Sequence, residues 1–188
     1  MYAFLLSTAV IFVAELGDKS QLMAMTFATR FKIWHVLVGI TAATALVHLA
    51  SVGLGAAVGT ALPTTAISVL AGVAFLGFAA WTLRGDELSE DEASKASRTT
   101  VNAVFAVAAA FFLAELGDKT MLATITLATD QNWFGVWLGS TLGMVAADAL
   151  AIVVGAMLGK HLPERVIRYG AAAAFAVFGV ILILSAVL

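Results

Sequence analysis

Long hydrophobic stretches alternate with short polar breaks along the whole chain. Each stretch can cross about 30 Å of hydrocarbon as a helix, which rises about 1.5 Å per residue. A β-barrel is disfavoured because its strands would show about ten residues of alternating polarity. The pattern therefore predicts an all-α integral membrane protein with six transmembrane helices. The expected spans are 2–29, 34–60, 64–84, 101–129, 134–159 and 164–187.

Composition agrees with a membrane protein, because 62% of the 188 residues are hydrophobic and only 12% are charged. The chain has no cysteine, which excludes disulfides and thiolate metal sites. The N-terminus has neither a basic region nor a small-residue cleavage pattern, so the first stretch is expected to be a permanent span.

The second half of the chain repeats the first at an offset of one hundred residues. The segment AELGDKS at 14–20 returns as AELGDKT at 114–120, and Pro63 is matched by Pro163. Each half carries three expected spans, and this odd number predicts that the halves enter the membrane from opposite sides. The expected organisation is a first three-helix repeat at 1–84, an acidic linker at 85–100 and a second three-helix repeat at 101–188. The linker is either solvated or regulatory.

Positive charges outside the repeated motif predict the orientation. With six spans they all fall on the side of the first, third and fifth loops, which the positive-inside rule places in the cytoplasm. The linker is then expected in the cytoplasm, with both termini on the opposite side of the membrane. The residues are Arg30, Lys32, Arg84, Lys95, Arg98, Lys160, Arg165 and Arg168.

The repeated motif places acids inside two expected spans, where a charge is costly and is a functional hypothesis by default. Glu15 and Asp18 are three residues apart, so on one helix they would share a face, and Glu115 and Asp118 repeat this spacing. Inverted repeats would bring the four carboxylates together near the midplane. Like charges so placed require either protons or a cation among them. A site that exchanges protons for a divalent cation is therefore expected.

A purely structural role for these acids is the alternative. Lys19 and Lys119 each follow a motif glutamate by four residues, which suits an intrahelical salt bridge. Such pairs would leave Asp18 and Asp118 uncompensated. The lysines are instead expected to hold the resting site near neutrality or to extend towards the cytoplasmic edge.

The small residues of the motif have two readings each. Gly17 and Gly117 either pack against a neighbouring helix or act as hinges where the helix unwinds and turns carbonyl groups towards an ion. Ser20 and Thr120 either ligate a metal or bond back to the carbonyl four residues earlier.

Two further positions break the symmetry between the halves. His48 aligns with Asp148, and either residue is a candidate for carrying or relaying protons. Gln21 aligns with Met121, so one half offers an amide oxygen and the other a thioether, with core packing as the alternative role.

The doubled Glu-x-Gly-Asp-Lys-Ser/Thr motif, one copy in each half with an acidic linker between them, resembles the Gdt-one family, also called uncharacterised protein family 0016. The resemblance covers essentially the whole chain, and the bare chain, with no targeting extension, resembles a bacterial member. It therefore implies a cell inner membrane with both termini on the periplasmic side. It implies a manganese and calcium cation/proton antiporter. It also implies that Glu15, Asp18, Glu115 and Asp118 bind the metal, with Lys19, Ser20, Lys119 and Thr120 completing the motifs.

The expected function is export of manganese, or calcium, from the cytoplasm in exchange for protons, with no permanently bound cofactor. Hard oxygen donors suit such cations. One alternative is a proton-coupled exporter of a small cationic metabolite. Another is a non-transporting assembly or scaffold protein, whose partners would contact exposed small residues such as Gly55 and Gly59.

An enzyme is not expected, because no nucleophile has a neighbouring base. The expected partners are the cation, protons and the lipid bilayer, with a homodimer as one option and no nucleic acid.

Overall fold

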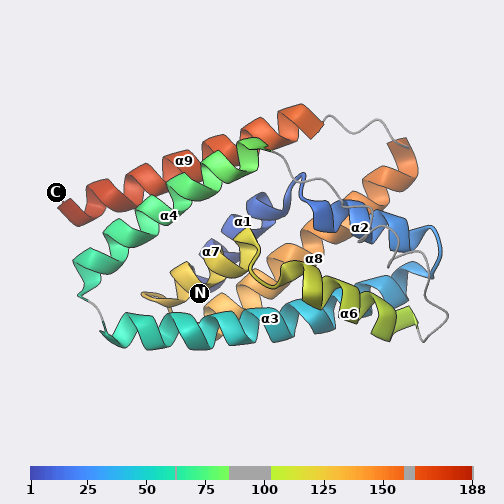
Figure 1. Cartoon of the computed structure of the whole chain (residues 1–188), viewed down its shortest axis with the longest axis horizontal. Coiled ribbons are helices and arrows are strands. Elements are labelled where there is room, and N and C mark those ends of the chain that lie inside the picture. The colour runs from blue at the N-terminus through green and yellow to red at the C-terminus, as the bar shows by residue number, and fades with distance from the viewer. Residues whose placement is uncertain (62, 85–102, 159–163, 188) are drawn as a thin grey trace.

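A computed structural model of the chain describes residues 1–61, 63–84, 103–158 and 164–187 (Figure 1). These residues form helices joined by short turns, without a strand. The expected linker at 85–100, Pro163 and Lys160 lie outside the described residues. The helices are α1 (Tyr2–Glu15), α2 (Lys19–Ala28), α3 (Ile33–Ala61), α4 (Thr64–Arg84), α6 (Ala103–Glu115), α7 (Lys119–Ala128), α8 (Trp133–Leu158) and α9 (Glu164–Val187).

Three of the described helices are long and apolar enough to cross a membrane. They are Ile33–Ala61, Trp133–Met157 and Tyr169–Val187, and shorter apolar helices lie at Tyr2–Glu15, Ser68–Arg84 and Ala103–Glu115. The chain is therefore a helical membrane protein.

The expected spans 2–29 and 101–129 are not continuous helices. Each divides into two helices at the repeated motif, α1 and α2 in the first half and α6 and α7 in the second. Gly17 and Gly117 have φ angles of 75° and 81°, in the left-handed region that an α-helix does not use. The two acids of each motif consequently do not share one face of one helix, and the expectation of a shared face is wrong.

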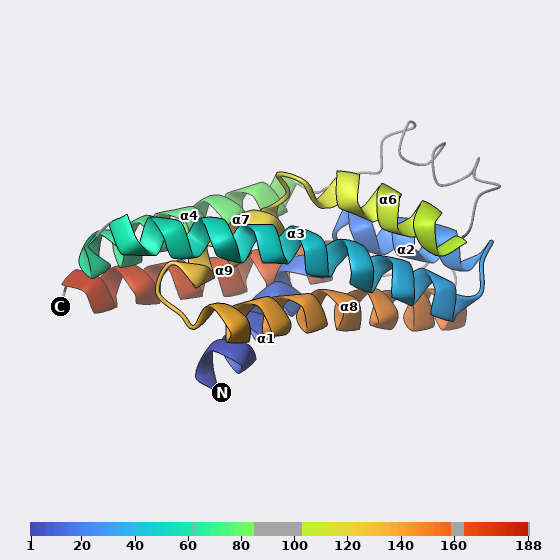
Figure 2. The same ribbon diagram turned by 90° about the horizontal axis from the view of Figure 1, so that it is seen from below.

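Helices of one half pack against helices of the other in a reciprocal pattern. Helix α1 packs along α8, and its counterpart α6 packs along α3, the counterpart of α8. Helices α4 and α9 pack on each other and lie side by side in both ribbon views (Figures 1 and 2). The apolar core accordingly contains residues of both halves, such as Ile11 and Phe111.

Glycines allow these helices to approach closely. A Cβ added to Gly72 of α4 would lie 2.7 Å from the carbonyl oxygen of Gly179 of α9, and the reverse distance is the same. Gly55 is buried, and a Cβ there would collide with backbone of α7, while a Cβ at the partly buried Gly59 would collide with backbone of Thr129, directly after α7. These two glycines therefore pack against another segment of the same chain, and the expected exposed face for scaffold partners is not present at them.

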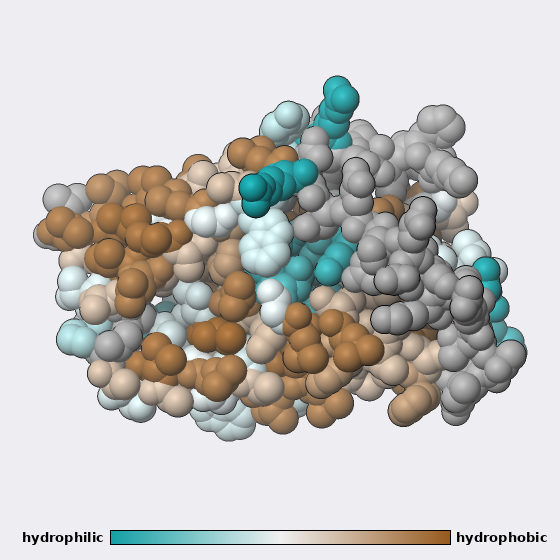
Figure 3. All heavy atoms as spheres, viewed as in Figure 1, coloured by the Kyte–Doolittle hydropathy of each residue, from teal (hydrophilic) through white to brown (hydrophobic). Residues whose placement is uncertain are grey.

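The outer surface of the described helices is rich in large apolar side chains. Leu70 of α4 is 58% exposed and Val177 of α9 is 60% exposed. Figure 3 shows hydrophobic residues over the part of the surface formed by α4 and α9. A surface of this kind suits contact with lipid.

Candidate cation-binding site

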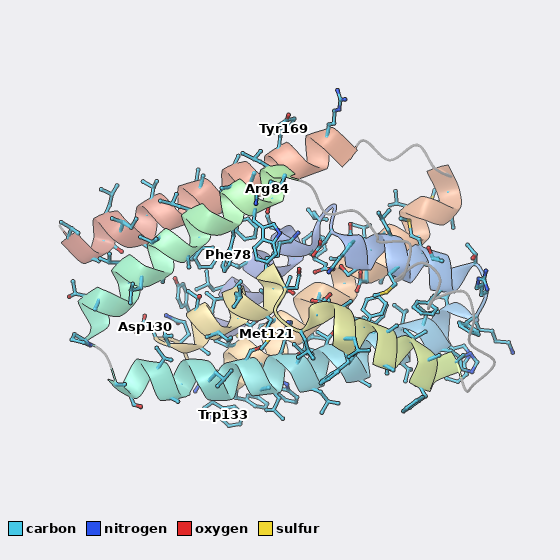
Figure 4. All side chains as sticks on the ribbon, viewed as in Figure 1. Phe78, Arg84, Met121, Asp130, Trp133 and Tyr169 are labelled. Atoms are coloured by element: carbon cyan, nitrogen blue, oxygen red, sulfur yellow. The ribbon has the colours of Figure 1, made fainter. Side chains whose placement is uncertain are left out.

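The two interrupted helices bring the motif acids to helix ends inside the molecule. Glu15 is the last residue of α1 and Asp18 is the N-cap of α2, with its Oδ1 accepting a 2.8 Å hydrogen bond from the amide of Lys19. Glu115 and Asp118 occupy the same positions at the ends of α6 and α7. All four acids are buried, with at most 5% of any residue exposed. Figure 4 shows side-chain oxygens gathered in the middle of the molecule.

Residues 21 and 121 stabilise the two helix breaks. The Gly17 amide donates to Gln21 Oε1 at 2.8 Å, and the Gly117 amide donates to Met121 Sδ at 3.2 Å. Asp18 and Asp118 also donate their amides to the carbonyls of Glu15 and Glu115 at 3.1 and 3.2 Å. Local hydrogen bonds thus satisfy most of the backbone polar groups that each helix break leaves without helical partners. Such bonds are required where the backbone lies in an apolar medium.

Each motif hydroxyl binds the glutamate of its own motif. Ser20 Oγ donates to Glu15 Oε1, and Thr120 Oγ1 donates to Glu115 Oε2 at 2.7 Å. These bonds differ from the alternative expectation, in which each hydroxyl would bond to the carbonyl four residues earlier. Within the described chain, the second oxygen of each glutamate has no hydrogen-bond partner. The hydroxyls therefore orient the glutamates and leave one oxygen of each available.

A buried ion pair connects the two halves. Lys119 Nζ lies 3.0 Å from Asp18 Oδ1, and the two side chains are 2% and 0% exposed. The helix breaks separate each motif glutamate from its lysine, so the pairs expected at i,i+4 do not lie on one helix. Lys119 instead compensates Asp18 of the other half, an acid that the intrahelical pairs would have left uncompensated. Each lysine attracts acids of the opposite half. The charge of Lys119 also attracts Glu15, and the charge of Lys19 attracts Glu115.

The acids of both halves lie within electrostatic reach of one another. Glu15 is repelled by Glu115, Asp148 and Asp18, and Glu115 is repelled by Asp118 and Asp18. In the described part of the chain, however, no three His, Asp or Glu side chains are placed closely enough to hold a metal ion. A cation bound among these carboxylates would require them to move closer together.

His48 and Asp148 lie on opposite sides of a helix crossing. Helices α3 and α8 meet at Thr44 and Met144, whose Oγ1 and Sδ are 3.3 Å apart. His48 and Asp148 each follow this contact by four residues, about 6 Å along the axis, and the two helices run in opposite directions (Figure 1). Both residues are completely buried, and among the described residues neither side chain has a hydrogen-bond partner.

Gln21 also joins the first helix break to α8. Its Nε2 donates a 3.0 Å hydrogen bond to the carbonyl of Ala147, next to Asp148. Met121, labelled on α7 in Figure 4, cannot donate such a bond. Sequence reasoning missed the Ala147 acceptor, since a backbone carbonyl gives no signal in the residue types.

Buried acids of two sequence repeats, held at interrupted helices in an apolar helical protein, are typical of membrane transporters of cations. The family model described as divalent cation/proton antiporter GDT1 matches residues 3–90 and 103–188. The chain therefore belongs to this family, which is a family of cation transporters and not of enzymes.

Relatives in bacteria and plants support the assignment. A Vibrio cholerae protein named "Putative manganese exporter" is 32% identical over 89% of this chain and 84% of its own length. A GDT1-like protein of Synechocystis is 30% identical over 95% of both chains. The chloroplastic GDT1-like protein 2 of Oryza sativa is 31% identical over 94% of this chain, which spans 59% of that relative. No solved structure matches the chain.

Proposed function

We propose that the chain exports a divalent cation, manganese first and calcium second, from the cytoplasm in exchange for protons. The observation that carries this proposal is the burial of acids from both halves at two helix breaks, within electrostatic reach of one another. The proposed metal-binding residues are Glu15, Asp18, Glu115 and Asp118, with the hydroxyls of Ser20 and Thr120 as orienting or ligating groups.

The donor chemistry suits hard divalent cations. Carboxylate and hydroxyl oxygens bind manganese, calcium and magnesium, and cysteine is absent from the sequence. Helices α1 and α6 end at the glutamates, so the partial negative charge of their last carbonyls also favours a cation there. The manganese-exporter name of the Vibrio relative supports manganese as the first substrate.

The proposed topology has six spans in two inverted repeats, at 1–84 and 101–188. Helices α1 and α2 form one interrupted span, α6 and α7 form another, and α3, α4, α8 and α9 supply the rest. The one-sided positive charges support cytoplasmic loops after the first, third and fifth spans, with both termini in the periplasm of an inner membrane.

In the proposed cycle, protons and the cation compete for the same carboxylates. The Lys119 ammonium group neutralises Asp18 when no cation is bound, and the charge of Lys19 attracts Glu115 of the second half. Gly17 and Gly117 serve as hinges while the halves rock about the site. Gln21 supports the first break, and His48 and Asp148 are proposed to contribute to proton coupling.

The test is to neutralise one acid of each repeat. Asp18→Asn and Asp118→Asn are each expected to abolish manganese/proton exchange in everted membrane vesicles, because each removes a charge that cation and protons share. Asp130→Asn is the matched control, since Asp130 is an exposed acid outside the site. Exchange at the wild-type rate in both site variants, at equal protein levels, would contradict the proposal.

A small cationic metabolite is the second candidate substrate, because the bond between Lys119 and Asp18 shows that the site accepts an ammonium group. Metal analysis of the purified protein distinguishes the two. Stoichiometric manganese supports a metal substrate, whereas its absence after equilibration with manganese supports the metabolite.

A further inference from the structure

Asp148 is a buried acid that the repeated motif does not include. It lies on α8 and is 0% exposed, and within the described chain neither carboxyl oxygen has a hydrogen-bond partner. Burying a carboxyl group without partners is costly, and native proteins rarely do so without a functional reason. The first repeat has His48 at the matching position, so only one half supplies this group.

Asp148 lies within electrostatic reach of the motif glutamates of both halves. Asp148 interacts electrostatically with both Glu15 and Glu115, which belong to different halves. One carboxyl oxygen of each glutamate accepts a hydrogen bond from a hydroxyl group. The second oxygen has no hydrogen-bond partner among the described residues. These three side chains thus present four oxygens without hydrogen-bond partners, two of them from Asp148.

The Gln21 side chain holds the first helix break beside Asp148. Gln21 bonds at once to the Gly17 amide in the break and to the Ala147 carbonyl on α8. In the other half the matching carbonyl, that of Val47, accepts instead from Ser51 Oγ of its own helix at 2.7 Å. The first break is therefore tied by a side chain to the helix that carries the extra acid.

We propose that Asp148 is a further ligand of the transported cation, completing with Glu15 and Glu115 a set of three carboxylates. This inference rests on the proposed cation transport. The site is one-sided, because the arriving cation first meets these three carboxylates on the side of α8, while Asp18 is engaged by Lys119 until the cation takes the place of the ammonium group. Because no three acids of the described chain lie at metal-binding distance, the cation draws α1 and α6 towards α8 when it binds.

The number of charged ligands sets the strength and preference of such a site. Asp148→Asn keeps the shape of the side chain and removes its charge, so it is expected to weaken manganese binding about tenfold or more. Asp148→Glu keeps the charge and lengthens the side chain. It is expected to retain binding within a few-fold of wild type and to change the manganese-to-calcium affinity ratio.

The experiment is titration calorimetry of the purified full chain with manganese, and separately with calcium, at one fixed pH. Thr141→Val is the matched control, because Thr141 is a mostly buried polar residue of α8 that bonds to its own helix at Trp137. It is expected to bind manganese as the wild type does. If Asp148→Asn does not fold, the affinity ratio of Asp148→Glu decides.

The outcomes separate this inference from the proposed transport. Loss of affinity in Asp148→Asn, with Thr141→Val unchanged, supports Asp148 as a ligand. Unchanged affinity in Asp148→Asn, or an unchanged affinity ratio in Asp148→Glu, overturns the inference while wild-type binding upholds the transport proposal. No manganese binding by the wild type overturns both.

Discussion

The ion pair between Lys119 and Asp18 combines two charges that would each be costly in the interior of the molecule. Both side chains are buried, and their charged atoms are 3.0 Å apart. Removing one partner of such a pair costs about 3–5 kcal/mol, because the other charge stays buried. A divalent cation can take the place of the ammonium group, so stability and cation binding should be coupled.

Lys119→Met is expected to destabilise the cation-free protein by about 3 kcal/mol or more, through the loss of this partner. Manganese should restore much of that loss, since it neutralises the same acids. The measurement is thermal unfolding in detergent with and without manganese. Lys32→Met, at an exposed position, is the control and should unfold as the wild type does. Equal stabilisation of Lys119→Met and wild type by manganese would argue against the exchange of ammonium for metal.

The chemistry of these residues could be predicted, but their partners could not. The doubled motif identifies the acids, and their burial follows from the apolar surroundings. A pair of Lys119 with Glu115 was the structural alternative, because four-residue spacing brings side chains together on a continuous helix. The helix break removes that spacing, and the pairing with Asp18 depends on the docking of two segments one hundred residues apart.

The helix breaks are the elements on which the site depends. Gly117 has φ of 81°, and a Cβ built there would meet no atom within 4 Å. A substitution at this position consequently tests the backbone conformation alone. For residues other than glycine the left-handed region costs about 1–2 kcal/mol.

Gly117→Ala is expected to lower the free energy of unfolding by about 1–2 kcal/mol and to reduce transport, because the break would shift towards helix. Gly53→Ala is the matched control, since Gly53 lies inside α3 and also has open space around it. That change should leave stability equal or higher by about 0.5–1 kcal/mol. Thermal unfolding and vesicle transport of both variants provide the check. Equal effects of the two substitutions would mean that the break does not need glycine.

Element boundaries could be predicted where hydrophobicity decides them. Helices α3, α4 and α9 lie within a few residues of their expected spans. The motif glycines allowed two interpretations, because glycine serves both as a packing residue and at helix breaks. An interruption of the first and fourth spans was one of them. Only the backbone conformation distinguishes these uses.

At the scale of the whole molecule, the repeat accounts for the reciprocal packing of helices. Helix α1 relates to α8 as α6 relates to α3, while α4 and α9 pair with each other. The proposed inverted topology places Lys32 and its counterpart Asn132 on opposite sides of the membrane. Both residues are exposed.

Lys32→Cys and Asn132→Cys provide a direct test of the topology, because the natural chain has no cysteine. In intact cells with an opened outer membrane, a membrane-impermeant maleimide should label residue 132 and should reach residue 32 only after lysis. Labelling of both positions from the same side would contradict the inverted arrangement. Protein levels and transport of each variant confirm that the reporter is folded.

The central claim is the exchange of a divalent cation for protons by this chain alone. The most direct measurement is proton flux in proteoliposomes that contain the purified protein and a pH-sensitive dye, after addition of manganese, calcium or magnesium. We expect proton movement opposite to manganese, less proton movement with calcium and none with Asp18→Asn. Manganese uptake without proton movement, or proton movement that does not depend on a divalent cation, would contradict it.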